Sequence, residues 1–200
     1  MNASATLRDV IGLDNTLPRL SETTLIMIDF QNTYRTGVMA LDGAEPALAA
    51  GARLLAAARS AGVPVVHVIN DGGEGTPYDI RTEIGAISPE VAPADGEPVV
   101  VKQFPDSFHR TDLERKLRDL DAGPHLVLAG FMTHMCVSFT AQGAFNLGYR
   151  PTVVAEATAT RSLTAPDGST VPAATLQAGS LTTITDLFGT VAPTVEHLTA

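Results

Sequence analysis

Residues 125–141 read HLVLAGFMTHMCVSFTA, an apolar run followed by a short turn and then by residues with helical spacing. A short apolar run bounded by a turn is typical of a buried strand. We predict a strand over 125–130 and a helix that begins at Cys136 and ends near Leu147. Cys136 is the single cysteine of the chain. At the start of a helix, free N–H groups and the helix dipole stabilise a thiolate, so we interpret Cys136 as a nucleophile.

Short β-rich runs and helical runs alternate on both sides of this segment, which is typical of a parallel α/β sheet. The pattern predicts a single domain over residues 1–200 with a core of about 22–192. The other predicted strands cover 24–29, 65–69, 99–102, 151–155 and a short run around 190–191. Predicted helices cover 46–60 and 173–188, and a Thr111/Glu114 capping-box pattern predicts that a further helix has Thr111 as its N-cap. The long segment 70–98 has little periodicity, and its glycines at 72, 73 and 75 predict a flexible, functional lid.

Composition narrows the class of protein. Apolar residues make up 44% and charged residues 18% of the chain, as in ordinary globular proteins. The formal net charge of −9 argues against nucleic acid and anionic membranes as partners. No apolar run reaches the roughly 18 residues of a membrane span. A lone cysteine without a visible secretory signal leads us to expect a cytoplasmic protein.

Polar residues follow three of the predicted strands. Asp29, Lys102 and the Cys136 turn all lie at carboxyl ends of strands, where open α/β sheets bind their ligands. Burial would raise the pKa of Asp29 and allow it to accept the thiol proton, while Lys102 would stabilise both negative charges. Each residue alone also fits an inert role: a buried thiol, a capping aspartate or a solvated lysine.

Three sequence motifs, taken together and in this order, indicate a protein family more specifically than any single residue in them. They are DFQNTY at 29–34, Lys102 followed by Ser107-Phe108, and GFMTHMCV at 130–137. Together they resemble the isochorismatase-like cysteine hydrolase superfamily, which includes nicotinamidases, N-carbamoylsarcosine amidases, and ureide and biuret hydrolases.

The resemblance implies a Rossmann-like three-layer α/β/α sandwich with a six-stranded parallel sheet in the order 3-2-1-4-5-6. It also implies a catalytic triad of Asp29, Lys102 and Cys136. The backbone N–H groups of Met132 and Cys136 would form the oxyanion hole, with a cis peptide bond before Met132. Members of this family are commonly oligomeric, so we expect a homodimer or homotetramer.

Candidate pocket residues flank these three positions. We predict that the substrate contacts are Gln31, Tyr34, His67, Phe104, Phe108 and Phe131. Nicotinamidases of the family carry an Asp-x-His metal motif, which residues 40–44 lack, and His67 alone cannot replace it because such zinc sites need at least three protein ligands. We therefore expect neither a metal nor another cofactor.

The retained cysteine favours hydrolysis of a C–N bond in a small molecule (an amide, imide or ureide) through a thioester. One alternative is an isochorismatase-type vinyl-ether hydrolase on the same fold. Another is a haloacid dehalogenase-like phosphatase or dehalogenase, suggested by Asp29 after the first strand. The third is a non-catalytic binding protein, since a fold alone does not give a function.

Overall fold

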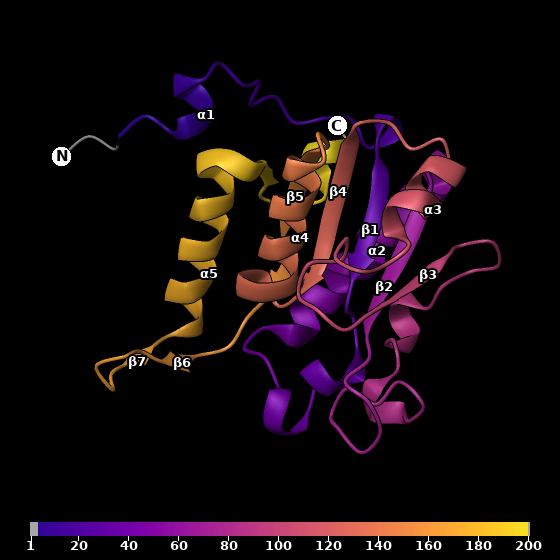
Figure 1. Cartoon of the computed structure of the whole chain (residues 1–200), viewed down its shortest axis with the longest axis vertical. Coiled ribbons are helices and arrows are strands. Elements are labelled where there is room, and N and C mark those ends of the chain that lie inside the picture. Colours follow the sequence, from indigo (N-terminus) through magenta and orange to yellow (C-terminus); the bar gives the residue numbers. More distant parts are fainter. Residues whose placement is uncertain (1–3, 200) are drawn as a thin grey trace.

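A computed structural model describes residues 4–199 of the chain. Six parallel strands form one sheet in the order β3-β2-β1-β4-β5-β8, which confirms the predicted fold and strand order, with β8 as the sixth strand (Figure 1). The strands are β1 (Thr24–Ile28), β2 (Val65–Asn70), β3 (Val99–Lys102), β4 (His125–Phe131), β5 (Arg150–Ala159) and β8 (Thr190–Ala192). Strands β6 (Leu163–Thr164) and β7 (Thr170–Val171) form a separate antiparallel pair that the sequence did not predict.

Helices cover both faces of the sheet. Helix α2 (Ala44–Ala61) packs on one face, and α3 (Leu113–Asp119), α4 (Ser138–Asn146) and α5 (Ala173–Thr183) lie on the other. Strand β1 shows why, because all its residues are buried and its side chains alternate between two clusters. Leu25 and Met27 belong to the cluster that contains α2, whereas Ile26 and Ile28 belong to the cluster of α3 and α4. The result is the three-layer sandwich.

Helix α2 meets the sheet closely through a glycine. A Cβ atom on Gly51 would lie 2.5 Å from the Phe30 ring, so only glycine leaves room for that ring directly after β1. The helix ends at Gly62, whose left-handed backbone (φ 68°) directs its N–H to the carbonyls of Ala58 and Arg59. This close packing helps to fix the segment that follows β1.

The predicted capping box at Thr111 is wrong by one residue. Helix α3 begins at Leu113 with Asp112 as its N-cap. The Thr111 hydroxyl instead donates to the Ser107 carbonyl at 2.6 Å and accepts from the Leu113 N–H at 3.2 Å. Glu114 accepts from Arg118 on the next turn rather than closing a box. The turn at Ser107 competes for the threonine hydroxyl, a contact that local spacing does not reveal.

The ends of the chain add two short helices, α1 (Leu7–Val10) and α6 (Glu196–Thr199). Among residues 4–199, no helix is both long and apolar enough to span a bilayer.

Candidate active site

Asp29, Lys102 and Cys136 meet at the carboxyl edge of the sheet. The Lys102 ammonium lies 2.7 Å from Asp29 Oδ2 and 3.2 Å from Cys136 Sγ. Strand register produces this meeting, since Ile28 on β1 is level with Gly130 on β4, and Asn70 on β2 is level with Lys102. The structure therefore brings these three side chains together at one edge of the sheet.

The three groups are removed from water. Asp29 is 0% exposed, Lys102 1% and Cys136 7%. A buried lysine and a buried carboxylate are rare unless paired, because each ion loses its hydration. Asp29 additionally adopts a left-handed backbone (φ 49°), which is uncommon for a residue other than glycine. Such strain is tolerated where the surrounding structure holds a functional group in place.

Cys136 lies inside a π-helical turn, Thr133–Val137, and the α-helix begins only at Ser138. The predicted helix start at Cys136 is thus displaced by two residues. The Met132 carbonyl accepts hydrogen bonds from the N–H groups of both Met135 and Val137. Turns of this kind are frequent at functional sites.

Electrostatics at the sulfur differ from the sequence expectation. Burial and the neighbouring Asp29 carboxylate raise the pKa of Cys136 to about 12, and Lys102 opposes this increase. Burial also raises the pKa of Asp29, again opposed by Lys102. The thiol therefore keeps its proton near neutral pH, and a base must remove that proton before the sulfur can act as a nucleophile.

The strand that leads to the turn needs a glycine. Gly130 has φ 132°, and a Cβ atom there would lie 1.8 Å from the Ile28 carbonyl oxygen. At the same place the register between β4 and β5 shifts. The peptide bond between Phe131 and Met132 is cis, at the position where the resemblance implies one.

Three of the predicted pocket residues lie beside the site. Tyr34 is 1% exposed and contacts the Phe131 ring edge-on, with ring centroids 5.6 Å apart. Burial raises the pKa of Tyr34, and the nearby Asp29 and Cys136 add to the increase. Gln31 is buried, and its side chain bonds the backbone of Asn70 in both directions and the Gly85 carbonyl. Gln31 and Phe131 thus build the wall of the site rather than reach into it.

The other three predicted pocket residues contact groups other than Asp29, Lys102 and Cys136. His67 is buried on the α2 side of β2, where its Nε2 lies 2.8 Å from Glu97. Phe104 is 38% exposed against His109 and Arg110. The Phe108 ring stacks on Tyr149, which precedes the amino end of β5. Alternation along β2 directs His67 to the α2 side of the sheet. The turn before α3 leaves Phe104 exposed and packs Phe108 against the core cluster of α3 and α4.

Tyr78 also lies near the site, although sequence analysis predicts no role for it. Its ring contacts Tyr34 edge-on at 5.7 Å. Burial raises the pKa of Tyr78, and a hydrogen bond with Tyr34 opposes the increase. The charges of Cys136 and Asp29 raise this pKa further, whereas that of Arg161 lowers it. Its hydroxyl therefore lies within electrostatic reach of the site. The sequence feature that could have pointed to Tyr78 is an aromatic residue within a glycine-rich loop.

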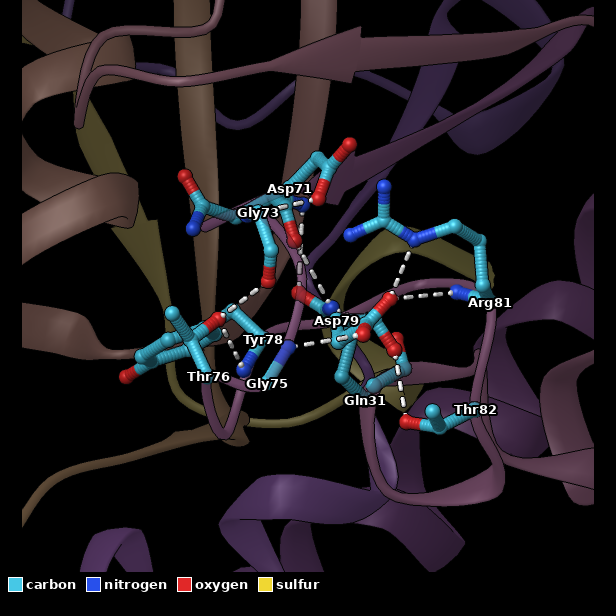
Figure 2. A network of polar contacts seen from close by, with 11 residues as sticks. Gln31, Asp71, Gly73, Gly75, Thr76, Tyr78, Asp79, Arg81 and Thr82 are labelled. Carbon is cyan, nitrogen blue, oxygen red and sulfur yellow. Dashed lines mark hydrogen bonds and ion pairs between the residues drawn. The ribbon is translucent and has the colours of Figure 1, made fainter.

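Asp79 holds the loop that carries Tyr78. Figure 2 shows its carboxylate bonded to the Gly75 N–H and to both the backbone N–H and the Nε of Arg81. Gly85 packs so closely on Asp79 that a Cβ atom there would lie 2.2 Å from the Asp79 carbonyl oxygen. The loop is a closely bonded structure, in contrast to the flexible lid expected from its glycines.

Metal ligation has no candidate among the described residues, because residues 4–199 contain no group of three or more His, Cys, Asp or Glu placed to hold an ion.

Comparison with known proteins agrees with the fold and the motifs. The isochorismatase domain model matches residues 23–194. The solved structure of an isochorismatase from Pseudomonas putida KT2440 aligns with a TM-score of 0.92 at 38% identity, covering 97% of this chain and 99% of that one.

Several curated relatives are named for an activity, and two of them are described here by their similarity to this chain. A streptothricin hydrolase of Streptomyces noursei is 38% identical over 152 residues, which is 75% of this chain and 55% of the relative. The ureidoacrylate amidohydrolase RutB of Stutzerimonas stutzeri is 31% identical over 176 residues, covering 70% of this chain and 71% of the relative. On the match to its domain model, the chain belongs to the isochorismatase family of hydrolases.

Proposed function

We propose that this protein hydrolyses a C–N bond of a small amide, imide or ureide through a thioester on Cys136, without a metal ion. The observation that carries this proposal is the buried Lys102 ammonium in contact with both Asp29 and Cys136. An inert cysteine would gain nothing from two desolvated charges beside it, because such charges are costly to bury. The names of the amidohydrolase and streptothricin hydrolase relatives favour the same bond class.

Acylation begins with proton transfer. Asp29 takes the proton of Cys136, and the thiolate attacks the substrate carbonyl to form a C–S bond. The backbone N–H groups of Met132 and Cys136 stabilise the oxyanion. Asp29 then gives its proton to the leaving nitrogen, and the C–N bond breaks. A raised pKa for Asp29 suits a carboxyl group that must hold a proton between these two steps.

Deacylation returns the enzyme to its initial state. Asp29 accepts a proton from water, and the resulting hydroxide attacks the thioester carbonyl. The C–S bond breaks, the acid leaves, and the proton held by Asp29 returns to the sulfur. Lys102 stays protonated throughout, because Asp29 and Cys136 outweigh its burial and raise its pKa. Its charge offsets the negative charge as it moves from oxygen to sulfur.

The test is a screen of amides, cyclic imides, ureides and isochorismate for release of ammonia or acid. The Cys136→Ala protein should be inactive on every substrate found, and Asp29→Asn should match it. Lys116→Met, a change at a partly exposed position on α3, is the control and should keep activity within about threefold. Full activity of Cys136→Ala would overturn the thioester mechanism.

The same screen separates the alternatives. Acid release from isochorismate by Cys136→Ala would favour vinyl-ether hydrolysis. A requirement for Mg²⁺ would favour phosphatase or dehalogenase chemistry, and no turnover of any substrate would favour a binding protein.

The assembly and the location stay predictions. A homodimer or homotetramer is supported by the exposed apolar side chains of Met135 and Phe139, which are 37% and 43% exposed. Light scattering of the purified protein measures the assembly. A cytoplasmic location is checked by fractionation of cells that produce the chain.

A further inference from the structure

Arg161 differs from most other arginines of this chain in its ion pairing and hydrogen bonding. Six other arginines form ion pairs with carboxylates: Arg35, Arg53, Arg59, Arg81, Arg115 and Arg118. Among residues 4–199, Arg161 has no such pair although it is partly buried, and its Nε is sealed from solvent without a hydrogen-bond acceptor. Its Nη1 donates to the Met39 sulfur at 3.7 Å, and a thioether sulfur is a weak acceptor.

Arg8 shows how this chain otherwise buries an arginine. It is 8% exposed, and its guanidinium donates to Asn15 Oδ1 and to the carbonyls of Asp14 and Leu187. Buried polar groups are nearly always satisfied in this way, since a buried donor without an acceptor has lost its hydrogen bonds to water without replacement. An arginine with an orphaned buried donor therefore points to an acceptor from outside the chain.

The position of Arg161 places that donor at the candidate active site. It lies two residues beyond Ala159, which pairs with Phe131 at the carboxyl edge of the sheet. The adjacent Thr160 hydroxyl bonds to the ring of His134, within the turn that carries Cys136. On its other side, Met39 belongs to the segment that follows Tyr34. Arg161 is therefore next in the chain to a residue bonded to the turn of Cys136, and its side chain contacts the segment that follows Tyr34.

We propose that Arg161 binds a carboxylate at the end of the substrate that is not hydrolysed. The planar guanidinium matches a carboxylate with two parallel N–H donors, and such pairs are among the strongest hydrogen bonds in proteins. Lys102 does not fill this role because Asp29 and Cys136 already occupy it. The inference rests on the proposed function in taking Cys136 as the reacting end. It narrows the substrates to anionic amides, imides or ureides.

Binding to an inactive protein tests the anchor without turnover. The background is Cys136→Ala, and the probes are malonamate, succinamate and glutaramate, each compared by calorimetry with its neutral diamide. The three lengths sample the distance between the two ends of the site. We expect at least one carboxylate to bind roughly 30-fold more tightly than its diamide, because the guanidinium makes a charge-assisted pair only with the former.

Two further variants in the Cys136→Ala background test whether Arg161 causes the preference for carboxylates. Arg161→Gln should remove the preference, and Arg161→Lys should keep part of it because the charge remains without the fork. Arg150→Gln is the control, an exposed arginine at the opposite end of β5, and should keep the full preference. Arg161→Gln should also unfold at the same or a higher temperature, since it removes an unsatisfied buried donor.

Equal affinity for carboxylates and diamides at every length overturns the proposal, as does a preference that persists in Arg161→Gln. Loss of folding in Arg161→Gln alongside no preference in the parent protein overturns it too. Failure of this anchor and failure of the proposed function give different results. An active Cys136→Ala protein would refute the thioester while a carboxylate preference stood, and an essential Cys136 without that preference would refute only the anchor.

Discussion

Two lysine–aspartate pairs in this molecule have similar lengths and very different surroundings. Lys102 lies 2.7 Å from Asp29 with both side chains 0% exposed, whereas Lys116 lies 2.5 Å from Asp112 on α3 with side chains 21% and 40% exposed. Water already solvates the second pair, so its formation changes the free energy of folding little. The first pair has lost its water, and each ion depends on the other. Distance alone therefore does not separate a functional ion pair from a surface one; desolvation does.

The largest expected effect comes from breaking the buried pair. Lys102→Met leaves the Asp29 carboxylate without its counter-ion, and we expect the free energy of unfolding to fall by about 3–5 kcal/mol at neutral pH. Hydrolysis should fall by roughly a thousandfold or more, because the charge that supports the thiolate is gone. Urea unfolding and steady-state kinetics measure the two effects. A variant with wild-type stability and activity would contradict the importance of desolvation.

An intermediate case is the cluster of His67, Glu97 and Arg59, which is half-buried and has no proposed catalytic role. Hydrogen bonds from Arg59 lower the pKa of Glu97 to about 2, with His67 contributing. Since the folded pKa lies below the ordinary 4.5, the stabilisation is complete above pH 4.5 and is lost as the pH falls towards 2.

We expect Glu97→Gln to lower the free energy of unfolding by about 2 kcal/mol at pH 7 and by much less near pH 2.5, after allowance for solvent screening. Urea unfolding across this range measures it. Catalytic activity of the folded variant should stay within about threefold of wild type. A loss of stability that is independent of pH would show that packing, rather than charge, accounts for this cluster.

A smaller effect is expected in the loop of Tyr78. Asp79→Asn weakens the bonds from Gly75 and Arg81, and we expect a loss of about 1–2 kcal/mol in the free energy of unfolding. Because Tyr78 lies near Cys136, KM should increase more than kcat decreases. Asp71→Asn, which alters another acceptor of the same loop, is the matched control. An unchanged KM would separate the loop from substrate binding.

The smallest effect belongs to the surface pair. Lys116→Met should change the free energy of unfolding by no more than about 0.5 kcal/mol and leave activity intact. Urea unfolding of Lys116→Met and Lys102→Met in the same buffer compares the two pairs directly. A loss of several kcal/mol would show that exposure does not distinguish the two pairs.

Much of the fold was readable from local patterns. Apolar runs at 24–29 and 125–130 predicted buried strands, because a parallel sheet covered on both faces requires apolar side chains on both faces. The structure has these strands at Thr24–Ile28 and His125–Phe131. The helix predicted over 46–60 corresponds to α2, Ala44–Ala61. The errors concern where helices begin. At Thr111 the hydroxyl bonds to the Ser107 carbonyl instead of capping the helix, and before Ser138 the backbone forms a π-helical turn.

Sequence by itself therefore determined the succession of strands and helices. Through the three motif blocks it also indicated Asp29, Lys102 and Cys136 as candidate site residues at the edge of the sheet. Only the tertiary structure decided the direction of His67, the closely bonded form of the Tyr78 loop and the orphaned donor of Arg161. Local periodicity reports what each segment buries. Desolvation and hydrogen-bond satisfaction depend on segments that are distant in the chain, so they exist only once the chain has folded.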